Sequence, residues 1–347
     1  MIILNIFGNV SPICISEKLK IYISNLPCQS ENNWNEALVE DMLQEIKERA
    51  IFSEVYGKDF ALYDLRKICI ETLGLDNLPE GMSEKEYLQI IADNLICIYF
   101  DYEYKDMPFF DWTTNCFDGR LCEEDYAEKL IKFLQFFVWK SEQCKPGEFS
   151  SFPSLIYTSN HDREYNFLLG ALNNKWQSSE IYIKSLRYWG HLIDNFLVNK
   201  NDYLQLDYLI NSVYKDNNYN AYHLFKAFSL CEMLLVKNSN SGKPSQLDNK
   251  LPFFLSEKYS KEEKLEFSKM VRQMRNKIGH GDFLRLNELL EEYAQKYMDG
   301  QYNYDYTEYS RLNWIYLHLC CGLDDVLARI LLLLFTDRIK FEKIKQS

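Results

Sequence analysis

Apolar side chains repeat at helical spacing along most of the chain. In residues 36–51 a stripe with a period close to 3.6 residues contains Leu38, Met42, Ile46 and Ala50. Residues 123–140 repeat this spacing after three acidic residues, which stabilise the positive end of a helix dipole. Helices are also predicted from the S-x-x-E capping box at Ser83 towards Ile96 and over 179–198.

The first residues of the chain follow a different pattern. The segments IILNIF, residues 2–7, and LKIYIS, residues 19–24, are short, and in the second apolar residues alternate with Lys18, Lys20 and Tyr22. A period of two residues is typical of a strand. We therefore expect two short strands ahead of the helices.

Residues after about 201 carry the pattern of a helical bundle, with helices expected over 202–214, 220–237, 260–278, 284–298 and 308–336. The third is the clearest, because Ser260 and Glu263 form a capping box and its apolar stripe continues to Ile278. Gly279 then stands where a helix commonly ends in a left-handed residue. On this prediction His280 turns back beside the last turn and converges with Arg275.

The length of the chain favours two domains. At 347 residues it exceeds the size at which one hydrophobic core usually stops growing. We expect a mainly α protein: residues 1–200 form an acidic, mostly helical N-terminal region with a small β element, and residues 201–347 form a C-terminal bundle.

The net charge of −12 comes entirely from residues 1–200, where 31 Asp and Glu exceed 19 Lys and Arg, whereas residues 201–347 carry 20 of each. An acidic region repels nucleic acid, so any contact with RNA must be local. Residues 261–280 hold six basic and three acidic side chains. This segment is therefore the predicted contact.

The composition favours a soluble protein in the cytoplasm. The N-terminus has no basic segment ahead of an apolar one, and the longest apolar run, residues 330–335, is far below the roughly 18 to 20 residues that cross a membrane. The ten cysteines show no C-x-x-C spacing, and several lie within apolar helical patterns. They are expected to be core thiols of a reducing compartment.

Arg275 and His280 are the strongest candidates for chemistry. An arginine fork matches two phosphate oxygens, and an imidazole gives or takes a proton near neutral pH. Together they suffice for attack of a ribose 2′-hydroxyl on the neighbouring phosphate, which needs a base, an acid and charge stabilisation. That reaction requires no metal and no cofactor.

The segment RNKIGHGD, residues 275–282, resembles the signature of the HEPN family, and its Apea-like branch in particular, in which glycine follows the histidine. The helix YHLFKAFSLCEMLL resembles an early bundle helix of the family, whose acidic residue would correspond to Glu232. The resemblance covers roughly residues 202–340. It does not extend to residues 1–200.

Members of this family are often metal-independent endoribonucleases of phage defence, toxin or RNA-processing systems, and they commonly form homodimers. The resemblance thus implies RNA as substrate and a homodimer through the bundle, with His280 as acid or base, Arg275 on the scissile phosphate and Asn276 orienting one of them. It also implies a catalytic role for Glu232, and the basic excess suggests substrate contacts by Arg272 and Lys277. The N-terminal region would sense or restrain the nuclease, through a regulatory partner or by itself.

Two other readings of RNKIGHG remain open. The same helix end could bind a nucleotide, RNA or a protein without catalysis. Alternatively, Arg275 and Lys277 could complement the helix dipole while His280 caps backbone carbonyls.

Several other motifs are expected to be structural. Arg311 and His318 also have family-like spacing, but the apolar residues between them predict a surface arginine and a packed histidine. NSGKPS, residues 240–245, lacks the first glycine of a phosphate loop and is expected to be a linker. Cys116 and Cys122 lack zinc spacing. The remaining histidines are expected on the surface or satisfied in the core, and the tyrosines of 293–309 are expected to pack between helices.

Overall fold

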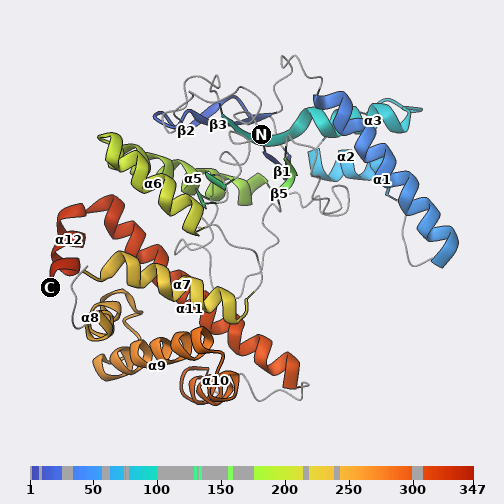
Figure 1. Ribbon diagram of the computed structural model, residues 1–347. Helices are drawn as coiled ribbons and strands as arrows, with labels where there is room; N and C mark the ends of the chain where they lie inside the picture. The colour runs from blue at the N-terminus through green and yellow to red at the C-terminus, as the bar shows by residue number, and fades with distance from the viewer. Residues whose placement is uncertain are drawn as a thin grey trace, which may run out of the picture. The chain divides into compact units, whose positions relative to one another are not determined.

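The chain is mainly α-helical and has a small β element, as the apolar pattern predicts. It divides into two compact units, Met1–Leu204 and Gln205–Ser347, and the division falls inside helix α6 (Lys200–Val213). Figure 1 shows the computed structural model. It describes residues 2–7, 10–25, 34–56, 63–73, 75, 78–100, 129–130, 133–134, 155–158, 176–213, 219–237, 243–298 and 308–347.

The β element of the first unit is a five-stranded antiparallel sheet with the strand order β2-β3-β4-β1-β5. The two predicted strands are confirmed as β1 and β3, and three further strands join them. The bounds are β1 (Ile2–Phe7), β2 (Ile13–Ser16), β3 (Ile21–Asn25), β4 (Leu95–Phe100) and β5 (Leu155–Thr158). β1 lies between β4 and β5, which come from distant parts of the chain.

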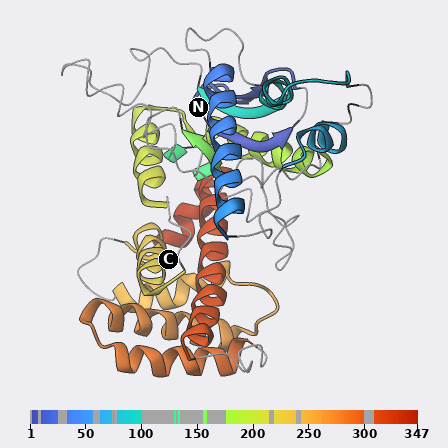
Figure 2. The same cartoon turned by 90° about the vertical axis from the view of Figure 1, so that its right-hand side faces the viewer.

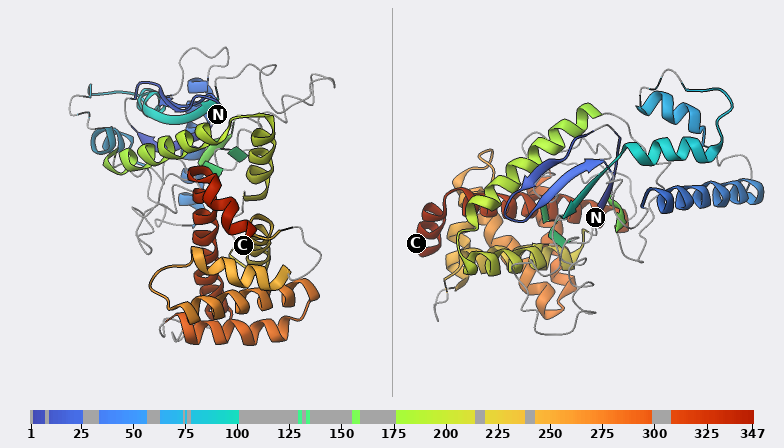
Figure 3. Two further views of the ribbon diagram at one scale, coloured as in Figure 1. Left: turned by 90° about the vertical axis from the view of Figure 1, so that its left-hand side faces the viewer. Right: turned by 90° about the horizontal axis from the view of Figure 1, so that it is seen from above.

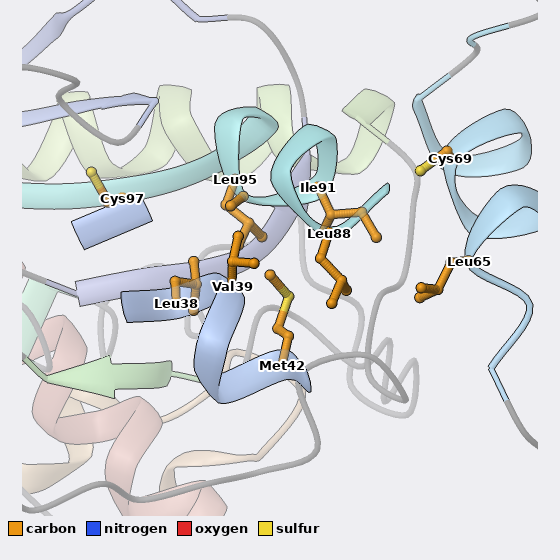
Figure 4. Close-up of a cluster of buried hydrophobic side chains, with 10 residues drawn as sticks. Leu38, Val39, Met42, Leu65, Cys69, Leu88, Ile91, Leu95 and Cys97 are labelled. Atoms are coloured by element: carbon orange, nitrogen blue, oxygen red, sulfur yellow. The ribbon is translucent and has the colours of Figure 1, made fainter. Parts of the chain in front are cut away.

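Three helices of this unit, α1 (Trp34–Tyr56), α2 (Leu65–Leu73) and α3 (Glu84–Asn94), share one hydrophobic core. Figure 4 shows Leu38 and Met42 of α1 beside Leu88 and Ile91 of α3, with Leu95 of β4 in the same cluster. Because successive strand residues face opposite sides, this core covers one face of β4 and leaves Ile96 and Ile98 for the other.

The helix predicted to run from Ser83 towards Ile96 is shorter than expected. Its capping box is present, with the Glu86 carboxylate 2.7 Å from the Ser83 backbone nitrogen, but the helix ends at Asn94. The next residues, LICIYF, form β4, and the first four of them, residues 95–98, are buried on both faces. An uninterrupted apolar run fits a buried strand as well as a buried helix, so the spacing does not separate them.

Most of the predicted helix 123–140 lies outside the described residues. Its four described positions, 129, 130, 133 and 134, are helical. Leu130 and Phe133 of the predicted stripe are buried.

Helix α5 (Trp176–Phe196) packs against β2 at a glycine (Figure 3). A Cβ added to Gly190 would lie 2.0 Å from the backbone oxygen of Ile15, so only glycine allows this approach. One turn later, the Asp194 carboxylate accepts hydrogen bonds from the Ser16 hydroxyl at 2.5 Å and from the Glu17 amide at 2.8 Å. Helix α5 thus holds the turn that joins β2 to β3.

The second unit is a helical bundle (Figure 2). Helix α9 packs against α7, α8, α10 and the short 3-10 helix η2, while α11 packs against α7, α10, η2 and α12. The bounds are α7 (Ala221–Leu235), α8 (Lys243–Lys250), η2 (Leu251–Phe254), α9 (Lys261–His280), α10 (Phe283–Tyr297), α11 (Glu308–Thr336) and α12 (Arg338–Gln346). The prediction of a linker over 240–245 is wrong for its second half, because α8 begins at Lys243 and Pro244 fits its first turn.

The lysine that ends α8 connects α7 to the last helix. The Lys250 ammonium is buried and donates to the backbone oxygens of Leu235, at 3.2 Å, and Lys345, at 2.7 Å. Both acceptors belong to the last turns of helices, where carbonyls lack intrahelical partners and a cation is favourable. Desolvation lowers the pKa of Lys250, and Lys237 and Lys345 add repulsion.

The described cysteines are free thiols, and Cys69, Cys97, Cys231 and Cys320 are buried, as expected for core positions. Burial raises the pKa of the Cys69 thiol to about 11 and that of Cys97 to about 12. Among the helices that the structure describes, none combines the length and the apolar character needed to span a membrane.

Candidate functional site

The helix that carries Arg275 and His280 begins and continues largely as its sequence predicts. Ser260 and Glu263 form the capping box, with the Glu263 carboxylate 2.7 Å from the Ser260 backbone nitrogen. Phe267, Val271 and Met274 of the apolar stripe are buried. The polar positions between them therefore lie along the sides of α9.

The predicted end of α9 is wrong by two residues. Gly279 is helical, His280 is the last helical residue, and Gly281 takes the left-handed conformation with φ +70°. The Gly281 amide donates to the Ile278 oxygen at 3.2 Å and the Asp282 amide to the Lys277 oxygen at 2.9 Å. These two bonds form a Schellman motif.

Gly279 lies beside Phe225 of α7. A Cβ added to Gly279 would lie 3.4 Å from Cε2 of Phe225, which is an ordinary van der Waals contact, so the aromatic ring packs against the helix without requiring glycine there.

Arg275 is held by α7 and by its own neighbour. Its Nη2 lies 2.5 Å from a carboxylate oxygen of Glu232, and its Nη1 donates to the Asn276 side-chain oxygen at 3.2 Å. The guanidinium also lies 5.5 Å from the centre of the Phe225 ring. The side chains of Arg275 and Glu232 are 30% and 28% exposed, so the pair is half-buried and open to solvent on one side. The structure thus joins three of the four residues assigned to catalysis.

His280 does not converge with Arg275 as predicted. Five residues along a continuous helix turn the side chain by about 140° and advance it by about 7.5 Å, so the two side chains point in different directions. The imidazole is exposed, and it has no hydrogen bond or ion pair within the described part of the chain. It does not cap the helix either, because the amides of Gly281 and Asp282 occupy the carbonyls of Ile278 and Lys277.

The two residues assigned to substrate contact are both paired with carboxylates. Arg272 makes a bidentate pair with the buried Asp248 of α8, through Nε at 2.9 Å and Nη2 at 3.0 Å. The hydrogen bonds that Arg272 donates to Asp248 raise the pKa of Arg272. Lys277 lies 2.7 Å from an Asp282 oxygen, and this bond lowers the pKa of Asp282. Arg272 therefore joins α9 to α8, and its substrate contact stays a prediction.

Ion pairs also reduce the basic character of the rest of α9. Lys264 pairs with Glu257 at 3.3 Å, whereas Lys261 and Lys269 are exposed. With the pairs of Arg272, Arg275 and Lys277, four of the six basic side chains of 261–280 have a carboxylate partner. Attraction of phosphate by this face is weaker than the sequence count implies.

No family model, curated protein or solved structure matches the chain. The resemblance to the HEPN family accordingly stays a prediction based on the residues of α7 and α9.

The second Arg and His pair is structural, as expected. Arg311 pairs with Glu291 at 2.7 Å, and Nδ1 of His318 lies 2.8 Å from the hydroxyl of the buried Tyr293. Burial raises the pKa of Tyr293 well above its usual value. Tyr293 and Tyr297 pack against Phe267 between helices, which confirms that expectation for the first part of the tyrosine cluster. Residues 299–307 lie outside the described residues.

Among the described residues, the other histidines form no second site. His223 is buried, with Nε2 3.0 Å from one oxygen of the buried Asp324 and 3.1 Å from the other. His191 is exposed and contacts Asn195 at 3.1 Å. Cys116, Cys122 and His161 lie outside the described residues, within which no three His, Cys, Asp or Glu side chains are placed to hold a metal ion.

Sequence reasoning missed the contribution of Phe225, which contacts both the Arg275 guanidinium and Gly279. Its position seven residues before Glu232 places both side chains on one face of α7, two turns apart. The seven-residue spacing of Phe225 and Glu232 can be read from the sequence and indicates that the two side chains share a face of the helix.

Replacing Gly281 with alanine is expected to lower the free energy of unfolding by about 1 kcal/mol, because a Cβ disfavours the left-handed conformation. The urea midpoint of the variant measures the loss. Gly279→Ala is the matched control: its backbone is helical and the nearest side-chain atom is 3.4 Å away. A Gly281→Ala midpoint equal to that of wild type would contradict the capping role.

Proposed function

We propose that the protein is a metal-independent endoribonuclease of the HEPN type that cleaves RNA through attack of a ribose 2′-hydroxyl. The observation that supports this best is the state of His280. It is an exposed imidazole without a partner in the described part of the chain, at the end of the helix that also carries the half-buried Arg275. A histidine that caps no helix and fills no core position is available for proton transfer.

In the proposed reaction a base removes the proton of the 2′-hydroxyl, and the oxygen attacks the adjacent phosphorus. The bond from phosphorus to the 5′-oxygen breaks, and an acid protonates the departing oxygen. Arg275 stabilises the charge on the phosphate oxygens. The products are a 2′,3′-cyclic phosphate and a 5′-hydroxyl, and no metal or cofactor takes part.

The divergence of Arg275 and His280 within one chain favours a homodimer through the bundle. In a two-fold arrangement, Arg275 of one copy and His280 of a second copy line the same cleft, and this histidine acts as the acid or the base. Glu232 and Asn276 orient the guanidinium. When phosphate binds, the Arg275 guanidinium must then either give up its contact with Glu232 or contact Glu232 and the phosphate together.

The proposed cellular setting follows from the resemblance to the HEPN family and from the charge of the first unit. The resemblance suggests a role in phage defence or in a toxin system of the bacterial cytoplasm. The acidic first unit is the part that would sense a signal or bind a regulatory partner.

A second function, a module that binds a nucleotide, RNA or a protein without catalysis, is favoured by the pairing of Arg275 with Glu232 and Asn276. Both terminal nitrogens of the guanidinium already have acceptors from the same chain. A site built this way binds phosphate only in competition with Glu232.

The test is cleavage of a mixed RNA panel in EDTA by wild type and by His280→Ala, with the product ends identified. We expect wild type to leave 2′,3′-cyclic phosphate and 5′-hydroxyl ends and His280→Ala to leave none. His191→Ala, which removes another exposed histidine, should behave as wild type. Equal cleavage by wild type and His280→Ala would remove His280 from the reaction, and binding of RNA without cleavage would support the non-catalytic module.

A further inference from the structure

Two exposed aromatic side chains belong to helices that pack against α9. Tyr222 on α7 is 71% exposed, and Phe283, the first residue of α10, is 57% exposed. Neither helps to fill the core of the bundle. They come from different helices, and their placement follows from the packing of α7 and α10 on α9.

The position of Tyr222 follows from the antiparallel packing of α7 and α9 (Figures 1 and 2). Phe225 lies against Gly279, whereas Glu232, two turns later on α7, reaches Arg275, one turn earlier on α9. Residue numbers on α7 therefore increase in the direction in which those on α9 decrease. Tyr222, nearly one turn before Phe225, is therefore at the level of the end of α9.

Phe283 follows His280 closely along the chain. Only Gly281 and Asp282 separate the two residues, and their backbone is held by the hydrogen bonds that end α9. The Asp282 side chain, which accepts from the Arg285 amide at 3.3 Å, caps the start of α10. The ring of Phe283 is thus attached to a rigid turn rather than to a long loop.

We propose that Tyr222 and Phe283 form a base-stacking subsite that holds nucleotides next to the phosphate bound by Arg275. The inference rests on the proposed function in taking single-stranded RNA as the ligand. Every nucleobase offers a flat face to an aromatic ring, so such a subsite binds single strands with little sequence preference. It excludes the paired strands of a duplex, whose bases are stacked on one another.

The charge around the end of α9 agrees with this occupant. Because four of the six basic side chains of 261–280 are paired with carboxylates, charge alone attracts an RNA strand weakly. Stacking supplies affinity that does not depend on net charge. Bases stacked on these rings would also be held apart near the scissile bond, which leaves the 2′-hydroxyl and the phosphate accessible to the imidazole.

The experiment measures binding of the full-length protein to a short single-stranded RNA with 2′-O-methyl sugars, which cannot be cleaved by 2′-hydroxyl attack. The same strand with abasic positions is measured beside it. We expect Tyr222→Ala to weaken binding of the base-containing strand roughly tenfold and to leave binding of the abasic strand unchanged. Tyr222→Trp should restore the affinity, and Phe283→Ala should act in the same direction as Tyr222→Ala.

The matched control is Phe253→Ala. Phe253 is an exposed aromatic of the same unit, 67% exposed, and belongs to η2 rather than to α7 or α10. Phe253→Ala should change neither the affinity for the base-containing strand nor the affinity for the abasic strand. Sedimentation of each variant shows whether the number of copies per particle changes.

The outcomes separate the subsite from the nuclease. Wild type that binds both strands equally would overturn the subsite even if it cleaves RNA. Loss of affinity by Tyr222→Ala that accompanies dissociation into single copies would also overturn it, because the ring would then be part of a protein interface. If binding depends on the bases and on Tyr222 but the protein cleaves no RNA, the stacking subsite is supported and the proposed nuclease activity is contradicted.

Discussion

An equal mixture of the Arg275→Ala and His280→Ala variants is expected to regain about a quarter of wild-type RNA cleavage, although each variant alone falls by roughly 100-fold or more. The two side chains diverge on α9, so a site that uses both combines Arg275 of one copy with His280 of another. Random pairing makes half of the dimers mixed. Each mixed dimer has one site with both residues and one site with neither, which yields the recovery of about a quarter.

The two variants are mixed under conditions that allow subunits to exchange. Cleavage is then measured as the appearance of 2′,3′-cyclic phosphate ends. Arg311→Ala is the matched control for Arg275→Ala, because Arg311 is also half-exposed and paired with a glutamate in the same unit. It should keep wild-type activity. A mixture that stays as inactive as its components would show that Arg275 and His280 act within one copy, and it would refute the two-fold arrangement.

Replacing Gly190 with alanine is expected to destabilise the first unit by roughly 3 kcal/mol or more. The added Cβ would lie 2.0 Å from the backbone oxygen of Ile15 and 2.7 Å from its carbon, both of which belong to β2. Neither partner can move alone, since Asp194 ties the following turn to α5. The helix must withdraw from the sheet, which exposes the buried side chains between them.

Hydrogen exchange by mass spectrometry checks this prediction in the full chain. Amides of β2, β3 and α5 should exchange faster in Gly190→Ala, while those of α9 and α11 stay unchanged. Gly322→Ala is the matched control, since Gly322 lies in α11 with no atom within 4 Å of an added Cβ. That change should raise stability by about 0.5 to 1 kcal/mol, because alanine is the better helix former. Unaltered exchange in β2 would show that α5 and β2 do not need the close approach.

The elements that the sequence predicts well are those defined by short-range rules. The bounds of α11 agree with the predicted range, and the capping boxes at Ser83 and Ser260 are both present. Helix spacing and caps depend on residues within one or two turns of each other. A sequence therefore contains all the information needed to place them.

The sheet shows where such rules stop. The first residues of β4 are predicted as the end of a helix, because an apolar run of six residues fits both structures. It becomes a strand by pairing with β1 and β3, which are more than 70 residues away along the chain. Only the tertiary structure supplies those hydrogen-bonding partners.

The candidate site divides in the same way. The sequence alone determined that Arg275, Asn276 and His280 lie at one end of an amphipathic helix, and the resemblance added Glu232. Tertiary packing decided which side chains are engaged: Glu232 holds Arg275, Asp248 holds Arg272, and Phe225 packs beside Gly279. Only the structure shows that Gly281, rather than Gly279, ends the helix and that His280 is exposed. The physical reason is that both glycines permit a left-handed turn, so no local rule separates them.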